Sequence, residues 1–424
     1  MTESSSSSLQ QPASNTTVFL DQPPSCLQFC PAVPDCCVIG TYLLAEQKDE
    51  SNDTNIKQTK TGSLQLWRIN PATNELTLLY KHSLPYAVFD LHFHPRDPSL
   101  LSIATSAGSV AFFRLTSGVK DDPPTLTPLL TQPVHEDPSI PALFLAWTPS
   151  TWPSITPDSS LDAFAVTFSD SRTTIFQYTP GASPDSPPQI TELDTFPASQ
   201  AIEVWFAALA TFHDPTTTTT SSSSQQQVPY IFTGNDFGAL HTRRYTSDHS
   251  QADRQLSVVL DHHDRARHHT AGVTSILPLP LPLKDDSPVI LTGSYDESLR
   301  VYHATRRGEV LAEIGLGGGV WRLQLLSSSS SENAEEGWTG LVLASCMHGG
   351  TRVVRVRYSA ESAEWELEVL AEFTEHESMN YASDVWRPAG GYDLPVRSEG
   401  GKQEVVCLSS SFYDRRVCLW RVRL

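Results

Sequence analysis

The chain has 424 residues, of which 39% are hydrophobic and 18% charged, and its formal net charge is −19. This length and composition allow a sizeable core, and the negative charge argues against nucleic-acid binders, which need a basic surface to meet phosphates. An acidic surface instead favours a cationic partner, or simply keeps the protein in solution.

Processing and targeting signals are weak. Seven cysteines, an odd number, do not form a disulfide framework, so we expect a reduced, cytoplasmic protein. Residues 1–16 contain no apolar core, and no run of eighteen apolar residues occurs. We therefore expect neither a signal peptide nor a membrane span.

A strand–turn–strand unit recurs along the chain. A degenerate first copy lies at 36–69, with an acidic, polar insertion near 46–60. Six clearer copies follow at 101–115, 165–178, 230–245, 289–302, 341–356 and 405–420. Their turn residues are spaced 52 to 66 residues apart, at Gly108, Asp170, Asp236, Asp296, His348 and Asp414. Uneven spacing is expected when loops vary in length and strands do not.

Seven units of four strands predict an all-β, seven-bladed β-propeller. The last unit ends on its third strand at 418–424, and the β-like run at 15–23 would supply the missing outer strand and close the ring. We expect residues 1–14 to form a disordered tail and 15–424 to form one propeller, without reason for more than a monomer. Low-complexity loop insertions are expected at about 46–60, 179–188, 215–227 and 327–337.

The fifth unit resembles the WD-repeat family most closely. His269, Ser294, Asp296 and Tyr302 occupy the positions where that family has a hydrogen-bonded His–Ser–Asp–Trp set. In the last unit Asp414 and Trp420 repeat the six-residue spacing of Asp296 and Tyr302. The favoured interpretation is a structural lock at each turn rather than a hydrolase triad.

The sixth unit departs from the pattern. His348 replaces the turn aspartate, and Cys346 stands where a serine is expected, both on one face of the strand by its two-residue period. His348 is a candidate general base or a structural residue. Cys346 is a candidate nucleophile, or a small buried packing residue.

Four units carry valine followed by an aromatic residue at the expected start of the innermost strand. Brought together at the mouth of the channel, these rings would form a cage for a quaternary ammonium group, or would merely pack the wall. The pairs are Val88-Phe89, Val204-Trp205, Val320-Trp321 and Val385-Trp386. Arg322 follows one of them, after the glycine run 317–319.

Metal and cofactor signals are poor. Cys26, Cys30, Cys36 and Cys37 lack zinc-finger spacing, and the histidine-rich run 261–269 is interpreted as a polar loop between blades. We expect no cofactor and no metal.

Several segments, taken together, resemble one WD-repeat family, the diphthine methyl ester hydrolases, often called diphthine methyltransferases. The similarity is strong over roughly 200–424, and the segments are HHTAGVTSI (268–276), TGSYDES (292–298), GGGVWRLQ (317–324), ASCMHGG (344–350), HESMNYASDVW (376–386) and SSFYDRRVCLW (410–420). The chain departs from the family at LLSSSSS (325–331), at Val385 and at Ser410.

The resemblance implies hydrolysis of the methyl ester on methylated diphthine of translation elongation factor 2, before final amidation to diphthamide. That side chain carries a trimethylammonium group, which suits an aromatic cage. We therefore expect the cationic group to be held by Trp205, Trp321, Trp386 and Tyr413, with Asp384 nearby. His348 would act as base and Arg322 would stabilise the oxyanion. Asp296, Asp384 and Cys346 stay open as working groups, and a non-catalytic adaptor or a methyl-lysine reader are the alternative functions.

Overall fold

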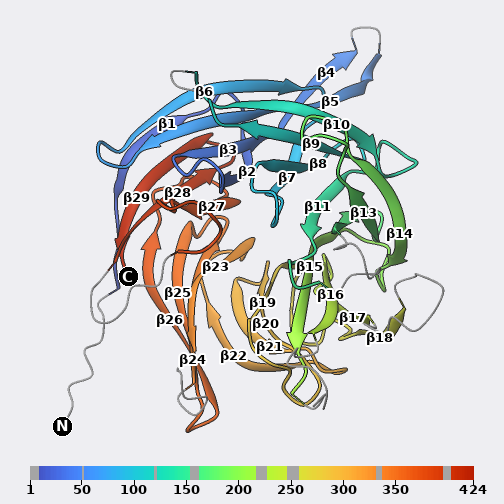
Figure 1. Cartoon of the computed structure of the whole chain (residues 1–424), viewed down its shortest axis with the longest axis vertical. Helices are drawn as coiled ribbons and strands as arrows, with labels where there is room; N and C mark the ends of the chain where they lie inside the picture. Colours follow the sequence, from blue (N-terminus) through green and yellow to red (C-terminus); the bar gives the residue numbers. More distant parts are fainter. Residues whose placement is uncertain are drawn as a thin grey trace.

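Seven β-sheets stand around a central channel in the computed structural model (Figure 1). The structure describes residues 9–49, 52–118, 122–152, 162–215, 227–245, 257–330, 337–394 and 403–424. Each sheet is antiparallel, with its first strand innermost, and we number the sheets as blades 1 to 7. The inner strands contact one another in chain order, and that of blade 7 contacts that of blade 1. The seven-bladed propeller predicted from the repeat is confirmed.

The strands of the first four blades are given from the channel outward. Blade 1 contains β2 (Pro24–Phe29), β3 (Cys36–Thr41), β5 (Asn52–Asn70) and β6 (Glu75–Leu84). Blade 2 contains β7 (Val88–Phe93), β8 (Leu100–Thr105), β9 (Ser109–Thr116) and β10 (Thr125–Pro133). Blade 3 contains β11 (Ala142–Trp147), β12 (Asp162–Phe168), β13 (Arg172–Thr179) and β14 (Gln189–Pro197). Blade 4 contains β15 (Val204–His213), β16 (Gln227–Asn235), β17 (Leu240–Tyr245) and β18 (Val258–His263).

The remaining blades follow the same order. Blade 5 contains β19 (Val273–Pro278), β20 (Val289–Ser294), β21 (Ser298–His303) and β22 (Glu309–Gly315). Blade 6 contains β23 (Arg322–Ser330), β24 (Trp338–Ser345), β25 (Thr351–Ser359) and β26 (Glu364–Phe373). Blade 7 contains β27 (Ala382–Val385), β28 (Glu404–Ser411), β29 (Arg416–Arg423) and, from the other end of the chain, β1 (Ser14–Phe19).

The ring is closed by pairing the two ends of the chain. In Figure 1, β1 in blue lies beside β29 in red, and the two strands pair antiparallel from Ser14 with Trp420 to Phe19 with Arg416. Closure removes the unpaired edge that a three-stranded last blade would leave. The predicted closing strand is confirmed. Of the predicted tail, residues 1–8 lie outside the described residues, whereas Gln10 exchanges backbone hydrogen bonds with Leu370 and Glu372.

The insertions differ in form. The one near 46–60 is not a loop, because β4 (Leu43–Asp49) pairs with β5 to make a ribbon that projects from blade 1 (Figure 1). The 179–188 segment joins β13 to β14 as an irregular loop. Residues 216–226 and 331–336 of the other two insertions lie outside the described residues, although the flanking Ser327–Ser330 extends β23.

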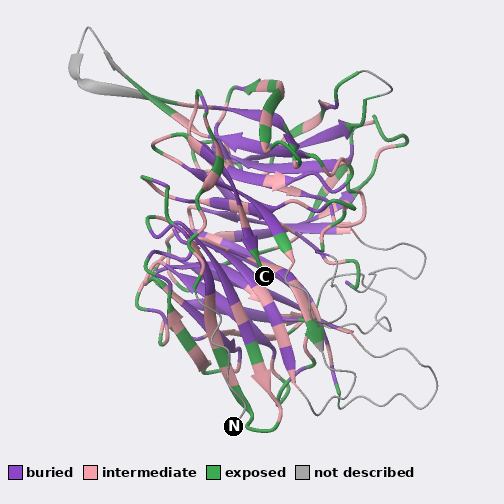
Figure 2. Ribbon diagram, turned by 90° about the vertical axis from the view of Figure 1, so that its left-hand side faces the viewer, coloured by how far each residue is buried: buried purple, intermediate pink, exposed green. Residues whose placement is uncertain are grey.

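Burial follows the layering of the blades. Every residue of β3, β8 and β20, second strands of their blades, is buried, because neighbouring blades cover both faces of these strands. Outer strands such as β6 and β10 alternate between exposed and covered residues. Figure 2 shows the buried strands in the interior and the exposed residues at loops and outer edges. Among the described residues no helix is long and apolar enough to cross a membrane.

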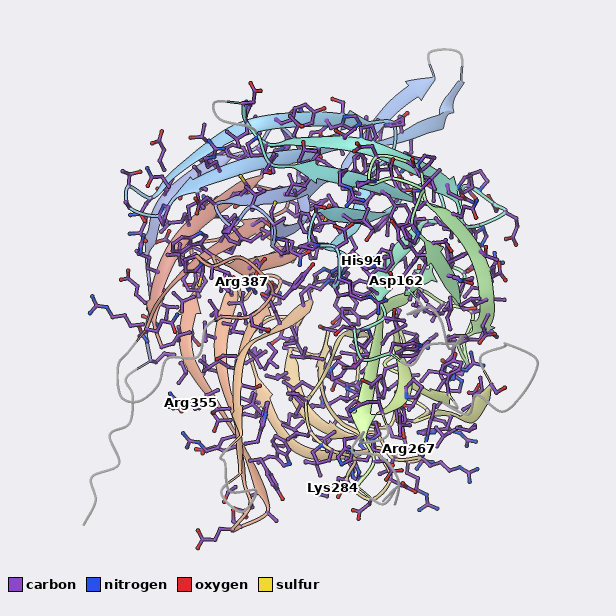
Figure 3. The ribbon with its side chains drawn as sticks, viewed as in Figure 1. His94, Asp162, Arg267, Lys284, Arg355 and Arg387 are labelled. Atoms are coloured by element: carbon purple, nitrogen blue, oxygen red, sulfur yellow. The ribbon has the colours of Figure 1, made fainter. Side chains whose placement is uncertain are left out.

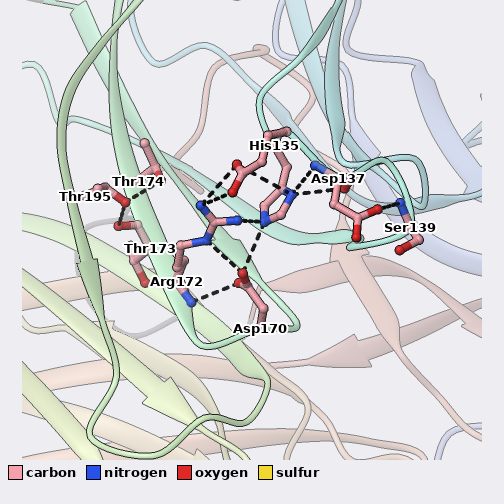
Figure 4. Close-up of polar contacts among 9 residues, drawn as sticks. His135, Asp137, Ser139, Asp170, Arg172, Thr173, Thr174 and Thr195 are labelled. Atoms are coloured by element: carbon pink, nitrogen blue, oxygen red, sulfur yellow. Dashed lines mark hydrogen bonds and ion pairs between the residues drawn. The ribbon is translucent and has the colours of Figure 1, made fainter.

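A charged lock holds the turn of blade 3 (Figure 4). His135 Nε2 lies 3.1 Å from Asp170 Oδ2, and Arg172 Nε donates to the same oxygen at 2.7 Å. Arg172 also pairs with Glu136 at 2.9 Å. Asp170, the aspartate at the turn of the repeat, therefore holds the segment that arrives from the preceding blade. This is the structural role that the sequence pattern predicts.

Candidate functional site

An aromatic pocket opens at the end of the channel where the inner strands begin. Its volume is about 540 Å³. Eight aromatic side chains from six blades line it, and we call this cavity the mouth pocket: Tyr42, Phe89, Trp205, Tyr295, Trp321, Tyr381, Phe412 and Tyr413. Its other walls are Pro23, Ser25, Leu43, Leu44 and Arg415.

The local fold of each blade aims these rings at the channel. Phe89 and Trp205 are the unpaired second residues of β7 and β15, where the strand register shifts as in a β-bulge. Such bulges re-aim a side chain. Trp321 and Tyr381 immediately precede β23 and β27, and Tyr295 immediately follows β20. In an antiparallel blade, the start of the first strand and the end of the second lie at one edge, so these positions converge.

The rings form a connected series around the mouth. The ring centroids of Trp205 and Trp321 are 5.6 Å apart, those of Trp321 and Tyr381 are 5.0 Å apart, and Tyr295 lies 5.8 Å from Trp321. Phe412 continues the series, 5.4 Å from Tyr381. Faces of aromatic rings carry negative electrostatic potential, so a concave set of them attracts a quaternary ammonium group.

The rim carries charges of both signs. Trp205 Nε1 donates to Asp236 Oδ1 at 2.7 Å, which places a carboxylate beside the rings. Burial, followed by the nearby charges of Asp236 and Tyr381, raises the pKa of Tyr295. Arg415, which also lines the pocket, donates from Nη1 to the carbonyl oxygen of Asp21 at 2.9 Å.

A smaller polar cavity of about 240 Å³ lies deeper in the channel. Ser25 and Tyr381 line both cavities, so the mouth pocket continues into this lower channel. The polar residues of the lower channel come from β2, β7, β23 and β27, the inner strands of blades 1, 2, 6 and 7. They are Gln28, Asp90, His92, Arg322, Gln324, Ser383 and Asp384.

Three of these groups lie together. His92 Nε2 is 2.7 Å from Asp90 Oδ2, and Arg322 NH2 is 3.8 Å from Asp90 Oδ1. Asp90 is buried, whereas the His92 side chain is 35% exposed, into the channel. Arg322 donates from NH1 to the carbonyl oxygen of Trp321 at 2.9 Å and lies 4.7 Å from the Trp321 ring centre. Burial lowers the pKa of Arg322. The ordinary pKa of a guanidinium is so high that the side chain nevertheless stays a cation.

The structure brings part of the expected site together. Trp205, Trp321 and Tyr413 line the mouth pocket, and Arg322 lies directly below them in the lower channel. Trp386 does not join them. It follows the end of β27, and its Nε1 donates to Asp35 Oδ1 at 3.1 Å. The Val385-Trp386 pair resembles the other pairs only in sequence, and the residue that precedes the inner strand of blade 7 is Tyr381.

The two catalytic candidates of the sixth unit lie outside both cavities. The two-residue period does not apply to them, because β24 ends at Ser345 and a turn follows. His348 is 56% exposed, and its Nε2 lies 3.4 Å from Glu297 Oε1. Cys346 is fully buried, and burial raises its pKa to about 12. The structure supports the packing interpretation of Cys346 and removes His348 from the pocket wall.

Asp384 is a structural carboxylate rather than a free ligand. It is buried, its Oδ1 pairs with Arg387 NH1 at 2.9 Å, and its Oδ2 accepts the backbone N–H of Phe29 at 2.8 Å. Asp384 thus joins blade 7 to blade 1, and Figure 3 shows Arg387 on the inner side of the ring, in contrast to Arg355 at its outer edge. Asp90 and His92 were not among the residues predicted from the sequence, where their signal is the polar alternation within FDLHF.

The predicted lock residues make structural bonds, with one correction. His269 Nε2 lies 2.9 Å from the Thr292 hydroxyl, while Ser294 donates to the carbonyl oxygen of Ala271 at 3.0 Å. The hydroxyl partner of the histidine is therefore Thr292, not Ser294. Asp296 accepts the backbone N–H of Thr270 at 2.9 Å and pairs with Arg300 at 2.9 Å, and Tyr302 donates to Asp264 at 2.9 Å.

Blade 7 carries a hydrogen-bonded chain of histidine, serine and tryptophan. His376 Nε2 lies 2.8 Å from the Ser409 hydroxyl, which accepts from Trp420 Nε1 at 3.0 Å. Asp414 accepts the backbone N–H of Glu377 at 3.2 Å. All of these residues lie outside the two cavities, consistent with their role in holding the turns.

Within the part of the chain that the structure describes, one group of side chains could hold a metal ion. His241, Asp261 and His263 place their ligand atoms within 4.8 Å of one another on β17 and β18, the outer strands of blade 4. Here the run expected to be a loop begins within strand β18. His241 Nε2 lies 2.7 Å from Asp261 Oδ1, and burial, then His263, lowers the pKa of His241 to about 4. The group is on the outside of the ring, apart from the mouth pocket.

Comparison with known proteins gives consistent relatives. No family model matches the chain. A protein of Schizosaccharomyces pombe named diphthine methyltransferase is 34% identical over 152 residues, which are 36% of this chain and 38% of that protein. Its human namesake is 24% identical, covering 81% of this chain and 68% of the human protein. The Saccharomyces cerevisiae namesake is 23% identical, covering 92% and 96%. The family resemblance inferred from the sequence is thereby confirmed.

Solved structures agree on the fold. Chaetomium thermophilum Sqt1 bound to the N-terminus of the ribosomal protein L10 has a TM-score of 0.54 and 11% identity, covering 97% of this chain and 100% of that one. Saccharomyces cerevisiae Sqt1 has a TM-score of 0.51 and 12% identity. At such low identity the likeness concerns the fold alone.

Proposed function

This chain is a relative of the diphthine methyltransferases, and from that premise we propose that it is a carboxylic ester hydrolase of diphthamide biosynthesis. It removes the methyl ester from methylated diphthine on translation elongation factor 2 and leaves the free carboxylate for amidation. We propose that it acts in the cytoplasm as a monomer, and that it needs no cofactor.

The observation that carries the proposal is the aromatic mouth pocket above a polar channel. The substrate side chain bears a trimethylammonium group and a methyl ester. The rings of Trp205, Trp321 and Tyr381 suit the first group by cation–π attraction. The methyl ester of the bound side chain then lies next to the lower channel, which the cationic side chain of Arg322 lines. A trimethylammonium group cannot be neutralised by proton loss, so an uncharged π surface is a better host than a buried carboxylate, whose desolvation is costly.

The charge of the chain agrees with this proposal. The formal net charge is −19, and Asp236 stands at the pocket rim, bonded to Trp205. Negative potential at the rim raises the local concentration of a cationic substrate and speeds encounter. At the rim, Tyr413 is 69% exposed and its ring packs edge-on against that of Phe412.

The test uses purified protein and elongation factor 2 isolated with methyl-esterified diphthine. We expect release of methanol and replacement of one methyl by hydrogen in the mass of the modified peptide. Elongation factor 2 with the free carboxylate serves as the control and should stay unchanged. Binding of the esterified factor without methanol release would instead indicate an adaptor. Binding of trimethyl-lysine peptides in preference to the factor would indicate a methyl-lysine reader.

A further inference from the structure

We propose that the lower channel is the catalytic site, with His92 as general base, Asp90 as its positioning residue and Arg322 as the oxyanion partner. The inference rests on the proposed function and assigns the reacting groups for it. The sequence pattern had pointed to His348, which lines neither cavity.

The three groups lie where the reacting end of a bound side chain would be. Asp90 and His92 are alternate residues of β7, so both face the channel. Arg322 is the first residue of β23 and directly follows Trp321 in the sequence. A group held against the Trp321 ring therefore lies close to the guanidinium of the next residue, Arg322. The lower channel continues directly below the Trp321 ring.

The charged neighbour of His92 suits it to accept a proton. Asp90 Oδ2 lies 2.7 Å from His92 Nε2, an ion-pair contact rather than an aligned hydrogen bond, because among the described residues neither of these two atoms has a hydrogen-bond partner. Nδ1, the ring nitrogen that does not contact Asp90, is therefore the candidate base, and the carboxylate stands beside the positive charge that the ring carries once it has taken a proton. Asp90 is itself buried, and Arg322 NH2 stands 3.8 Å from its other oxygen, too far for a hydrogen bond. This guanidinium nitrogen of Arg322 therefore keeps an N–H donor available for a ligand.

The step balances with water as the only co-reactant. His92 Nδ1 takes a proton from water as the water oxygen bonds to the ester carbonyl carbon, and negative charge develops on the carbonyl oxygen beside Arg322. The tetrahedral intermediate then breaks its bond to the methoxy oxygen. His92 returns the proton to that oxygen, so methanol leaves, and the carboxylic acid product loses its proton to solvent.

The nucleophilic side chains of the channel are less suited. Burial, then the nearby charge of Asp90, raises the pKa of Cys26, so its thiol stays protonated. Ser25 donates its hydroxyl to the carbonyl oxygen of Val88 at 2.6 Å. Among the described residues, neither side chain forms a hydrogen bond with His92, so direct attack by water is favoured over an acyl-enzyme.

The experiment compares turnover of methyl-esterified elongation factor 2 by wild-type protein and by His92→Gln, Asp90→Asn and Arg322→Lys variants. We expect His92→Gln to lower kcat by about 10²–10⁴-fold, and Arg322→Lys to lower it by up to about 10²-fold. KM and the binding of tetramethylammonium, followed by tryptophan fluorescence, should stay unchanged. His82→Gln, on outer strand β6, is the matched control for replacing a partly exposed histidine.

Two further readouts separate catalysis from folding. The His92→Ala variant should regain turnover when imidazole is added, because the lower channel is continuous with the mouth pocket, and a merely structural role gives no rescue. Asp90→Asn should lower kcat without changing KM. Asp90→Glu should restore part of the loss.

The outcomes distinguish this inference from the proposed function. Wild-type kcat in His92→Gln, or loss of turnover in His348→Gln instead, overturns the assignment of the base while the proposed function stands. Trapping of an acyl intermediate on Cys26 or Ser25 also overturns it. An absence of turnover by the wild-type protein removes the proposed function, and this inference with it.

Discussion

The ring centroids of Trp205 and Trp321 lie 5.6 Å apart, although one is the second residue of the inner strand of blade 4 and the other precedes that of blade 6. Tyr295 of the intervening blade contacts both rings, at 6.3 Å and 5.8 Å between centroids. Three successive blades thus contribute one continuous aromatic wall. This wall is the basis of the first prediction.

Trp321→Ala should raise KM for the methylated substrate about tenfold, because a desolvated cation–π contact contributes about 1–2 kcal/mol and 1.4 kcal/mol corresponds to a factor of ten. The value of kcat at saturation should change little. Steady-state kinetics on esterified elongation factor 2 measures both. Trp365→Phe, on outer strand β26, is the control, and an unchanged KM in Trp321→Ala would argue against the aromatic cage.

Asp384→Asn should destabilise the fold by about 3–5 kcal/mol, because it leaves the buried guanidinium of Arg387 without its counter-charge. Urea denaturation at neutral pH gives the free energy of unfolding. Glu366→Gln is the control: it removes an exposed pair with Arg357 and should cost less than about 1 kcal/mol. If Asp384→Asn were as stable as wild type but bound substrate more weakly, Asp384 would be a substrate-binding residue, as the sequence had suggested.

Acid should destabilise the protein through its buried histidines. Burial, the largest cause in each case, lowers the pKa of His376 to about 4 and that of His269 to about 3. Because these values lie below the unfolded value of about 6.5, the unfolded chain binds more protons between these limits. The stabilisation is therefore present above about pH 6.5 and is lost as the pH falls toward 4, by up to roughly 3 kcal/mol for His376.

The measurement is the urea midpoint as a function of pH, with wild type and His376→Gln compared. We expect the variant to be less stable at pH 7 but to lose less stability on acidification, since one of the proton-accepting groups is gone. Equal pH slopes in the two proteins would contradict the assignment to His376.

Cys346→Ala should leave kcat and KM unchanged and lower the free energy of unfolding by about 1 kcal/mol, through lost packing. Burial raises the pKa of this thiol to about 12. Alkylation by iodoacetamide should therefore be slow in the native protein and fast in urea. Inactivation of the native enzyme by one equivalent of reagent at Cys346 would restore the nucleophile hypothesis.

Local rules in the sequence were sufficient for the architecture. Alternating β-branched residues, turn aspartates and a missing last strand predicted seven blades and the pairing of β1 with β29, because blades repeat and each repeat obeys the same strand period. The same repeat allowed Trp205, Trp321 and Arg322 to be placed at one rim. It misplaced Trp386, where a Val–aromatic pair stands at the far end of an inner strand.

The chemistry of the channel depended on the tertiary structure. His92 has no distinguishing motif, and its closeness to Asp90 and Arg322 exists because the inner strands of blades 2 and 6 face each other across the channel. His348 looked catalytic because it broke a pattern, yet a turn after β24 carries it to the surface. The strand period, which a sequence displays, determines which way a residue points within its own blade. Which residues of other blades it meets depends on how the ring closes.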